Sequence, residues 1–222
     1  MRTQEQTGES LTADVFELLK RDHRNVRALL DEIEGAEDEG KRRGLFAQLV
    51  NEVESHSQAE DDVFYTSIEG DPELVDRIDD ARQEHDQVES LLEELDGLSV
   101  SADDWLEKVR EIRMLIEHHV SEEEQVIFLL ARRSMSDEEA LRLGREFLHA
   151  KQLVTEEVSS ERLVAVTGDS TGVAAVLDGT IDVSADIDQM SKRELYELAR
   201  QRRIGGRSAM TKAELVIALR GK

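Results

Sequence analysis

The stretch HSQAEDDVFY at residues 56–65 places a histidine and a glutamate four positions apart, and HHVSEEEQVIF at residues 118–128 repeats this spacing. Residues at positions i and i+4 lie on the same face of a helix, one turn apart, so the two side chains of each pair can converge on one point. The chain therefore carries the same two-residue element in each half. The two pairs are His56 with Glu60 and His119 with Glu123.

Around these pairs, apolar residues recur at alternating steps of three and four in four segments. This period is typical of helices that bury one stripe of side chains. A polar stretch from Gly35 to Gly44 separates the first two segments, the residues Gly70 to Pro72 end the second, and Gly97 follows the third. Because such short connections make neighbouring helices antiparallel, we expect an all-α, up-down-up-down four-helix bundle over residues 11–158.

The rest of the chain is organised differently. A fifth helical segment, from Ser136 to Val158, carries its own apolar stripe, which predicts an extra helix that packs on the outside of the bundle. Residues 159–190 combine glycines with serine, threonine and small apolar residues, a composition typical of a flexible linker. Helical periodicity returns in residues 191–222, where we expect a small basic helix-loop-helix module.

Six polar residues occupy positions that the helical period turns into the bundle. A carboxylate buried without a partner is costly, and a shared cation would satisfy two carboxylates and four imidazoles together. One such histidine alone would be read as a core residue bonded to a backbone carbonyl, but four in one layer favour a metal site. Zinc usually takes four ligands, whereas six nitrogen and oxygen ligands suit two iron or manganese ions. The six residues are His23, His56, Glu60, His85, His119 and Glu123.

Two further histidines do not follow this pattern. His118 stands beside His119 but about a quarter-turn away from the stripe, so we interpret it as a flank residue. His149 lies off the apolar stripe of the fifth helical segment, which favours a surface position.

The order of the six residues, with the two quoted stretches, resembles the hemerythrin-like, or HHE cation-binding, family over residues 11–155. The resemblance implies a non-haem centre of two carboxylate-bridged iron ions that binds or senses dioxygen, nitric oxide or peroxide, or that holds iron. The third helix of the oxygen-carrying members has a second ligating histidine, and this chain has Glu89 there. A carboxylate at this position either ligates iron or accepts a hydrogen bond from a ligand histidine, and its charge favours the ferric state.

The sequence leaves three functions open. The first is the binding or sensing of a small oxidant, and the second is an enzyme that turns over hydrogen peroxide or nitric oxide at the same centre. The second requires an open coordination position and a path for electrons or protons. The third is a metal-stabilised interaction module, in which zinc would replace iron without loss.

Composition excludes several classes of protein. The absence of cysteine excludes disulfides, thiolate metal sites and a cysteine nucleophile. The longest apolar runs are too short to cross a membrane, and residues Met1 to Ser10 are too polar for a secretory signal. We therefore expect a soluble, cytoplasmic protein without a membrane partner.

Charge separates the C-terminal module from the rest of the chain. The formal net charge is −23, yet residues 183–222 carry a net charge of about +4 by formal counting. The segment Arg202-Arg203-Ile204-Gly205-Gly206-Arg207-Ser208, followed by Lys212, forms a basic loop between two short helices. This stretch of sequence resembles the small SAP and Rho N-terminal modules. The resemblance implies contact with nucleic acid through Arg202, Arg203, Arg207 and Lys212. The alternative is a basic tail that docks on the acidic body or on another protein.

Overall fold

The computed structural model describes residues 13–102, 104–167, 187, 195, 198–199, 202 and 212–220, and for residues 156–167 and 212–214 it describes the backbone alone. The chain divides into two compact units, Met1–Ser159 and Ser160–Lys222. Each unit is described by itself below.

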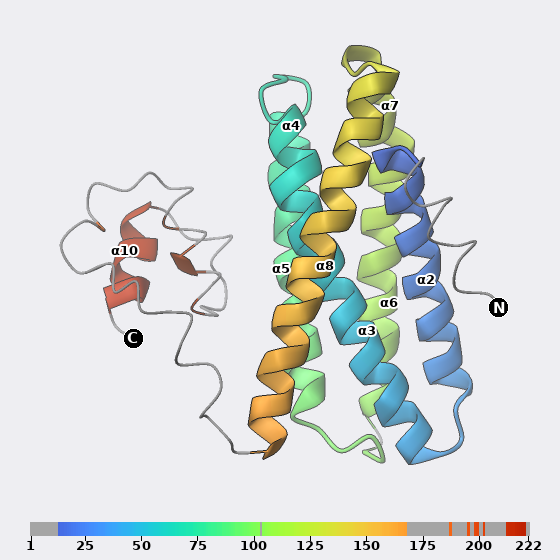
Figure 1. The fold of residues 1–222 in the computed structure, drawn as a ribbon. Coiled ribbons are helices and arrows are strands. Elements are labelled where there is room, and N and C mark those ends of the chain that lie inside the picture. Colours follow the sequence, from blue (N-terminus) through green and yellow to red (C-terminus); the bar gives the residue numbers. More distant parts are fainter. Residues whose placement is uncertain are drawn as a thin grey trace. The chain divides into compact units, whose positions relative to one another are not determined.

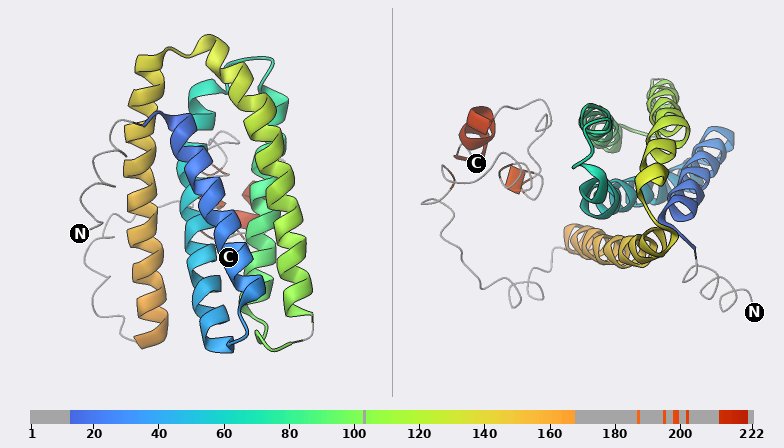
Figure 2. Two further views of the ribbon diagram at one scale, coloured as in Figure 1. Left: turned by 90° about the vertical axis from the view of Figure 1, so that its right-hand side faces the viewer. Right: turned by 90° about the horizontal axis from the view of Figure 1, so that it is seen from above.

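Four long helices form the first unit, and successive helices run antiparallel (Figures 1 and 2). This arrangement confirms the expected all-α bundle and follows from the short connections between amphipathic helices. The four helices are α2 (Val15–Gly35), α3 (Glu39–Ala59), α5 (Val75–Asp96) and α6 (Trp105–Glu122).

Two of these helices continue through a π-helical turn. Helix α3 runs into η1 (Glu60–Tyr65) and the short helix α4 (Thr66–Ile68), and α6 runs into η2 (Glu123–Ile127) and α7 (Phe128–Ser134). The two halves of the bundle therefore repeat one pattern, a plain helix followed by a helix with a widened turn.

Helix α3 begins earlier than the hydrophobic pattern predicted. Glu39, its first residue, lies inside the polar stretch that we expected to be a connection. The side chain of Asp38 caps the helix by accepting a hydrogen bond from the backbone N–H of Lys41, at 2.7 Å. The capping signal lies outside the apolar stripe, and for that reason the stripe alone placed the start of the helix too late.

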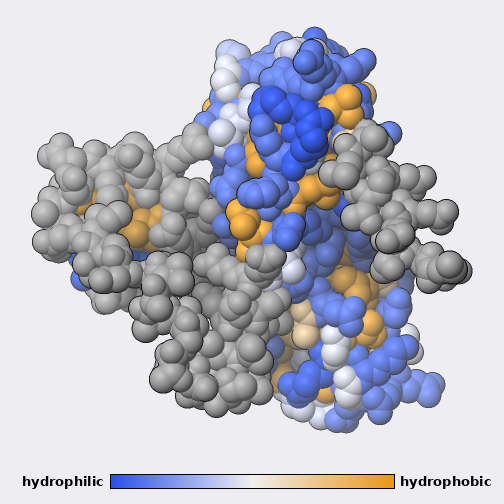
Figure 3. Space-filling model, viewed as in Figure 1, coloured by the Kyte–Doolittle hydropathy of each residue, from blue (hydrophilic) through white to orange (hydrophobic). Residues whose placement is uncertain are grey.

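The core of the bundle consists of two apolar clusters on either side of a polar layer. Along α2, Phe16 and Leu19 belong to one cluster, His23 lies in the layer, and Val26 and Leu30 belong to the other. Because the polar side chains occupy only one layer, each cluster keeps an ordinary hydrophobic interior. The coloured part of the surface in Figure 3 is largely hydrophilic.

Helix α8 (Asp137–Thr167) is the expected fifth helix, and it packs on the outside of the bundle through Ala140, Leu143 and Phe147. It continues nine residues beyond the predicted end at Val158, so residues 159–167 of the predicted linker are helical. No glycine or proline occurs in that segment before Gly168, and nothing local therefore stops the helix. The remainder of the predicted linker, apart from Ile187, lies outside the described residues.

The second unit has a small apolar core around helix α10 (Lys212–Arg220). Leu195, Leu215 and Leu219 are buried there, and the partly buried Leu198 packs against them. None of the helices in the described part of the chain has the length and apolar character needed to span a membrane.

Candidate metal centre

The six residues that the sequence singled out lie together in the buried polar layer of the bundle. Their exposed fractions run from 0% for Glu60 and Glu123 to 7% for His85. Each of the four bundle helices contributes one histidine to the layer, near the middle of α2 and α5 and in the last turn of α3 and α6. His23 comes from α2, His56 from α3, His85 from α5 and His119 from α6, and the two glutamates follow in η1 and η2.

Both glutamates are the first residue of a π-helical turn. In η2, for example, the backbone N–H of Phe128 donates to the carbonyl of Glu123, five residues earlier. Such single widened turns are rare and occur often at functional sites, because they turn side chains away from the regular helical phase. The helical period had indicated which way the glutamates face, but it contained no sign of the wider turn.

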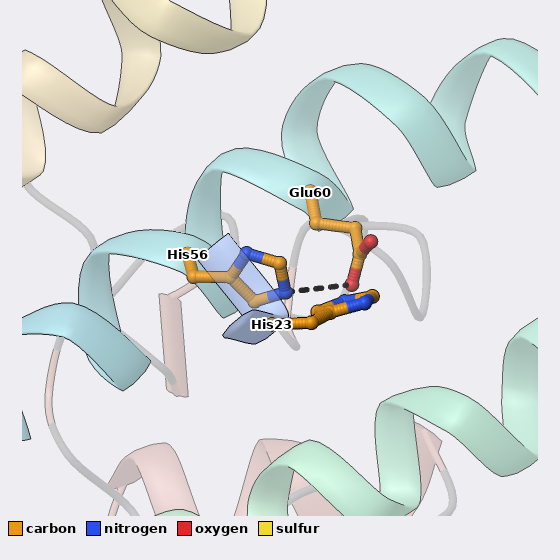
Figure 4. A group of neighbouring side chains, drawn as sticks. All are labelled: His23, His56 and Glu60. Carbon is orange, nitrogen blue, oxygen red and sulfur yellow. Dashed lines mark ion pairs between the residues drawn. The ribbon is translucent and has the colours of Figure 1, made fainter. Parts of the chain in front are cut away.

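Three residues form a first cluster, in which one ligand atom from each lies within 4.8 Å of the others: His23, His56 and Glu60. Figure 4 shows the two imidazoles and the carboxylate pointing toward one another. The Nε2 atom of His56 lies 3.6 Å from Oε2 of Glu60. The rings of His23 and His56 meet edge to face, with their centroids 5.1 Å apart.

A second cluster of the same kind consists of Glu60, His85 and His119. Oε2 of Glu60 lies 3.3 Å from Nε2 of His85 and 4.0 Å from Nε2 of His119. Glu60 therefore belongs to both clusters. The other glutamate lies between them, because Oε2 of Glu123 is 3.1 Å from Nε2 of His23 and 4.0 Å from Nε2 of His119.

Several of these buried atoms have no hydrogen-bond partner among the described residues. They lie close to opposing groups, yet without the geometry of a hydrogen bond. Buried polar groups are rarely left in this way, and an absent ion is one of the few explanations. The donor set of imidazole nitrogens and carboxylate oxygens fits iron or another divalent transition metal. The atoms are Nε2 of His23, both ring nitrogens of His56, both carboxylate oxygens of Glu60, Nδ1 of His85 and Oε2 of Glu123.

The two glutamates differ in their affinity for protons. Burial raises the pKa of Glu60 well above its ordinary value, and the carboxylate of Glu123 beside it raises it further. Burial also acts to raise the pKa of Glu123, but its contact with His23 lowers that pKa below the ordinary range. Two carboxylates this close cannot both stay ionised at low cost without a cation between them.

The histidines also differ. Burial lowers the pKa of His56 below its ordinary value and lowers that of His85 much further. Burial acts in the same direction on His23, but the carboxylates of Glu123 and Glu124 outweigh it and raise the pKa of His23. At neutral pH the rings of His56 and His85 are therefore uncharged, which is the form that ligates a metal.

Comparison with known proteins agrees with this geometry. The hemerythrin HHE cation-binding domain matches residues 14–131, more than half of the chain. The chain belongs to the hemerythrin HHE family.

Individual relatives are identical to this HHE protein at about a quarter of the aligned residues. A protein of Nostoc sp. described as a DNA nickase is 27% identical over 154 residues, which are 67% of this chain but only 42% of the nickase. A hemerythrin-like protein of Schizosaccharomyces pombe is 24% identical over 142 residues, 63% of this chain and 70% of that protein. A solved HHE-domain protein of Mycobacterium kansasii has the same fold, with a TM-score of 0.59 and 24% identity over 71% of this chain and 95% of that one.

Three carboxylates outside the two clusters lie against the candidate ligand histidines of the HHE domain. Oε1 of Glu124 lies 2.9 Å from Nδ1 of His23, and Oε2 of Glu84 lies 3.0 Å from Nδ1 of His119. Outer carboxylates of this kind orient metal-binding histidines and hold Nε2 toward the metal. The third is Asp22, whose Oδ2 lies 3.7 Å from Nδ1 of His56.

Sequence reasoning missed these three residues, although a signal existed. Each stands directly next to a predicted ligand in the chain: Asp22 before His23, Glu84 before His85, and Glu124 after Glu123. Acidic residues are so common in this chain that adjacency alone did not distinguish them from solvated surface.

Tyr65 is a further residue of the site that the sequence did not single out. Its hydroxyl donates a hydrogen bond to Oε1 of Glu123, at 3.1 Å, and its ring stacks on His85 with the centroids 6.0 Å apart. Both side chains of this hydrogen bond are buried. Tyr65 ends the π-helical turn that begins at Glu60, so one widened turn supplies both a candidate ligand and a group that fixes the other glutamate.

A small cavity of about 30 Å³ adjoins the histidines. About 10–15 Å³ of such space is enough for one water molecule, so the cavity has room for a small ligand of a few atoms. Its lining combines polar groups with branched apolar side chains. The apolar lining residues are Val26, Val53, Val88, Ile116 and Val120.

The other predicted positions lie outside the two clusters. Glu89 is half-buried on α5, and neither cluster of described residues includes it. The side chain of His118 is 72% exposed, and its Nε2 lies 3.3 Å from Oε1 of Glu84. His149 is exposed on α8.

The basic residues of the C-terminal unit are described only in part. The Nη1 atom of Arg202 donates to the backbone carbonyl of Leu219, at 2.9 Å, so this guanidinium stabilises the end of α10. Lys212 is the first residue of α10. Arg203 and Arg207 lie outside the described residues, as does the side chain of Lys212.

Proposed function

We propose that the HHE domain holds two iron ions between the four histidines and the two glutamates, and that this centre binds or senses dioxygen, nitric oxide or peroxide, or holds iron. The observation that carries the proposal is the pair of three-residue clusters that share Glu60. A carboxylate common to two ligand sets is the natural bridge between two ions. Glu123 lies near a histidine of each cluster and is the second candidate bridge.

The choice of iron rests on the number and kind of ligands. Six imidazole and carboxylate ligands exceed what a tetrahedral zinc ion takes, and they suit iron or manganese. Glu89 enters this proposal as an additional carboxylate, which either ligates iron or accepts a hydrogen bond from a ligand histidine.

Bound iron would supply a place where a small oxidant can be held or reduced. The side chains around it have separate roles. Glu84 orients His119 and Glu124 orients His23, in each case through the Nδ1 atom of the histidine. The hydroxyl of Tyr65 holds Glu123. The apolar residues around the cavity limit its size. These features favour a ligand of a few atoms.

The alternative is an enzyme that turns over hydrogen peroxide or nitric oxide at the same centre. It shares every ligand with the leading proposal and differs in needing repeated exchange of ligand, electrons and protons. Absorption spectra separate the two, because a binding protein gives a stable adduct while an enzyme consumes the added ligand.

The test is anaerobic reconstitution with ferrous iron, followed by metal analysis and by exposure to oxygen, nitric oxide and peroxide. We expect two iron ions per chain and a spectral change with at least one of the three ligands. A reproducible single zinc ion, with no uptake of a second metal, would overturn the two-iron proposal.

Matched variants check the ligand assignment. His56→Ala and Glu123→Ala should lose iron, because both side chains lie in the buried layer. His118→Ala and His149→Ala should keep it, because both histidines are exposed. Equal iron loss in His118→Ala would mean that the ligand assignment is wrong by one position.

We also propose that the C-terminal unit brings the HHE domain to DNA. The basic segment 183–222 supports this, and the Nostoc relative described as a DNA nickase points in the same direction, although the match covers 42% of that protein. The contact would fall mainly on Arg203, Arg207 and Lys212, because Arg202 already binds the end of α10. Phosphate contacts of this kind carry little sequence preference.

A gel-shift titration tests the DNA proposal. With about three phosphate contacts, affinity should fall with a log–log salt slope of roughly −3. The Arg203→Ala/Arg207→Ala double variant of the full chain should lose about two thirds of this slope. A chain that ends at residue 167 is the control and should not bind. Absence of any shift of the full chain at about 50 mM salt, a condition that favours phosphate binding, would favour docking of the basic unit on an acidic protein surface instead.

A further inference from the structure

The outer helix α8 reaches the candidate metal centre. Its Phe147 is fully buried and meets the ring of His56 edge to face, with the centroids 6.1 Å apart. One turn later, Lys151 points to the same region of the bundle. None of the six candidate ligands lies on α8, yet this helix packs directly against one of them.

Lys151 joins the two helices that carry the first cluster. Its Nζ lies 2.5 Å from Oδ2 of Asp22 on α2 and 2.6 Å from Oε1 of Glu52 on α3. Asp22 directly precedes His23 in the chain, and Glu52 lies one helical turn before His56. The ammonium group therefore ties together the backbones that present both histidines of this cluster.

The contact with Asp22 matters most, because this carboxylate is 1% exposed and faces His56. A buried carboxylate needs such a cation to keep its charge and its position. Among the described contacts of Asp22, the one with Lys151 holds the oxygen that faces Nδ1 of His56. Arg21 lies 3.6 Å from the other oxygen, Oδ1, and cannot replace that contact.

Close backbone packing fixes the register of α8. A Cβ atom on Gly144 would lie 2.6 Å from the carbonyl oxygen of Ala13, just before α2, so only glycine fits there. Gly144, Phe147 and Lys151 are spaced by three and four residues and share one face of α8. The glycine contact and the Lys151 contact therefore hold the same face of the helix at two points.

From these contacts we propose that Lys151 is a positioning residue of the metal centre: it holds Asp22 against His56 and so favours the ion of the first cluster, His23, His56 and Glu60, over the ion of the second. The inference rests on the proposed two-ion site. The proposal makes α8 part of the metal centre, and it assigns each of two outer carboxylates to one of the two ions. Asp22 serves His56 in the first cluster, and Glu84 serves His119 in the second.

Stepwise titration of the metal-free full chain with Co²⁺, followed by visible absorption and calorimetry, tests this. Lys151→Met keeps the length of the side chain and removes its charge. We expect one of the two equivalents to bind about 10- to 100-fold more weakly, the usual effect of losing an outer partner, and the other to be unchanged. Glu84→Gln should weaken the other equivalent. Arg142→Met is the control, because Arg142 lies on α8 but pairs only with exposed neighbours.

Lys151→Arg separates positioning from a general effect on folding, because it restores the charge and should recover most of the lost affinity. Unchanged binding in Lys151→Met overturns the inference. Equal loss of both equivalents does so as well, because it reports general destabilisation. If the wild-type chain takes up a single equivalent, the two-ion proposal fails by itself. The Lys151→Met comparison is then made on that one ion, where unchanged affinity again overturns the inference.

Discussion

Replacement of Glu60 by methionine should stabilise the metal-free protein while it abolishes metal binding. Both oxygens of Glu60 are buried without a hydrogen-bond partner, and the carboxylate faces Glu123. A buried carboxylate in this state opposes folding, and an apolar side chain of similar length removes that cost. We expect the free energy of unfolding at pH 7 to rise by about 1–3 kcal/mol, the usual cost of an unsatisfied buried polar group.

The sign of the pH dependence follows from the raised pKa of Glu60. Its ordinary value is 4.5, and burial keeps the proton bound in the folded state well above that pH. The unfolded chain releases the proton above pH 4.5, so the wild-type protein loses stability as pH rises through this range. The advantage of Glu60→Met should therefore be larger at pH 7 than at pH 5.

Trp105 makes the measurement specific to the bundle, since it is the single tryptophan of the chain and is fully buried in one of the apolar clusters. Urea unfolding with a chelator present, followed by tryptophan fluorescence, gives the free energy of unfolding. Glu117→Met, at a side chain 51% exposed, is the control and should change it by less than about 0.5 kcal/mol. Added metal should stabilise the wild type and leave Glu60→Met unchanged. Destabilisation of the metal-free chain by Glu60→Met would refute the argument, because it would show that the carboxylate is satisfied without a metal.

Three other outcomes are expected. Tyr65→Phe should keep metal uptake but change the absorption spectrum of the reconstituted centre, because the phenol donates to Glu123; identical spectra would contradict a role for this hydrogen bond. Gly144→Ala should lower the free energy of unfolding by about 1–3 kcal/mol through its clash with the carbonyl of Ala13, whereas Gly44→Ala, where nothing lies within 4 Å, should raise it by about 0.5–1 kcal/mol. Metal affinity should fall as pH falls from 7 to 5, since protons compete for the histidines, and a pH-independent affinity would argue against imidazole ligands.

The sequence predicted the bundle and the layer of six polar residues, because both follow from helical periodicity. This periodicity is a local property, and tertiary packing rarely overrides it where the periodicity extends over whole helices. It predicted the start of α3 and the end of α8 less well, because Asp38 acts through a cap and residues 159–167 carry no break. The π-helical turns could not be predicted, since a widened turn depends on packing between helices. Lys151 was also missed, because its partner Asp22 is 129 positions away in the chain.

Two of the three outer carboxylates, Asp22 and Glu84, show how neighbouring residues of one helix serve different ligands. Consecutive residues of a helix point about 100° apart, so a residue beside a ligand cannot face the same point as that ligand. It faces the adjoining helix instead. Asp22, next to His23, therefore meets His56 of α3, and Glu84, next to His85, meets His119 of α6.

The same geometry sets one histidine apart from the other three. Nδ1 of His85 has neither a hydrogen bond nor an ion pair with the described residues, whereas a carboxylate lies near Nδ1 of each of the others. The ring of His85 stacks on Tyr65 instead. Stacking restrains the plane of a ring, but unlike an outer carboxylate it does not determine which nitrogen carries the proton. Tyr65 links this ring to Glu123, because its hydroxyl donates a hydrogen bond to that carboxylate. The two clusters therefore differ in their outer partners: both histidines of the first cluster have a carboxylate near Nδ1, and in the second cluster His119 has one and His85 does not.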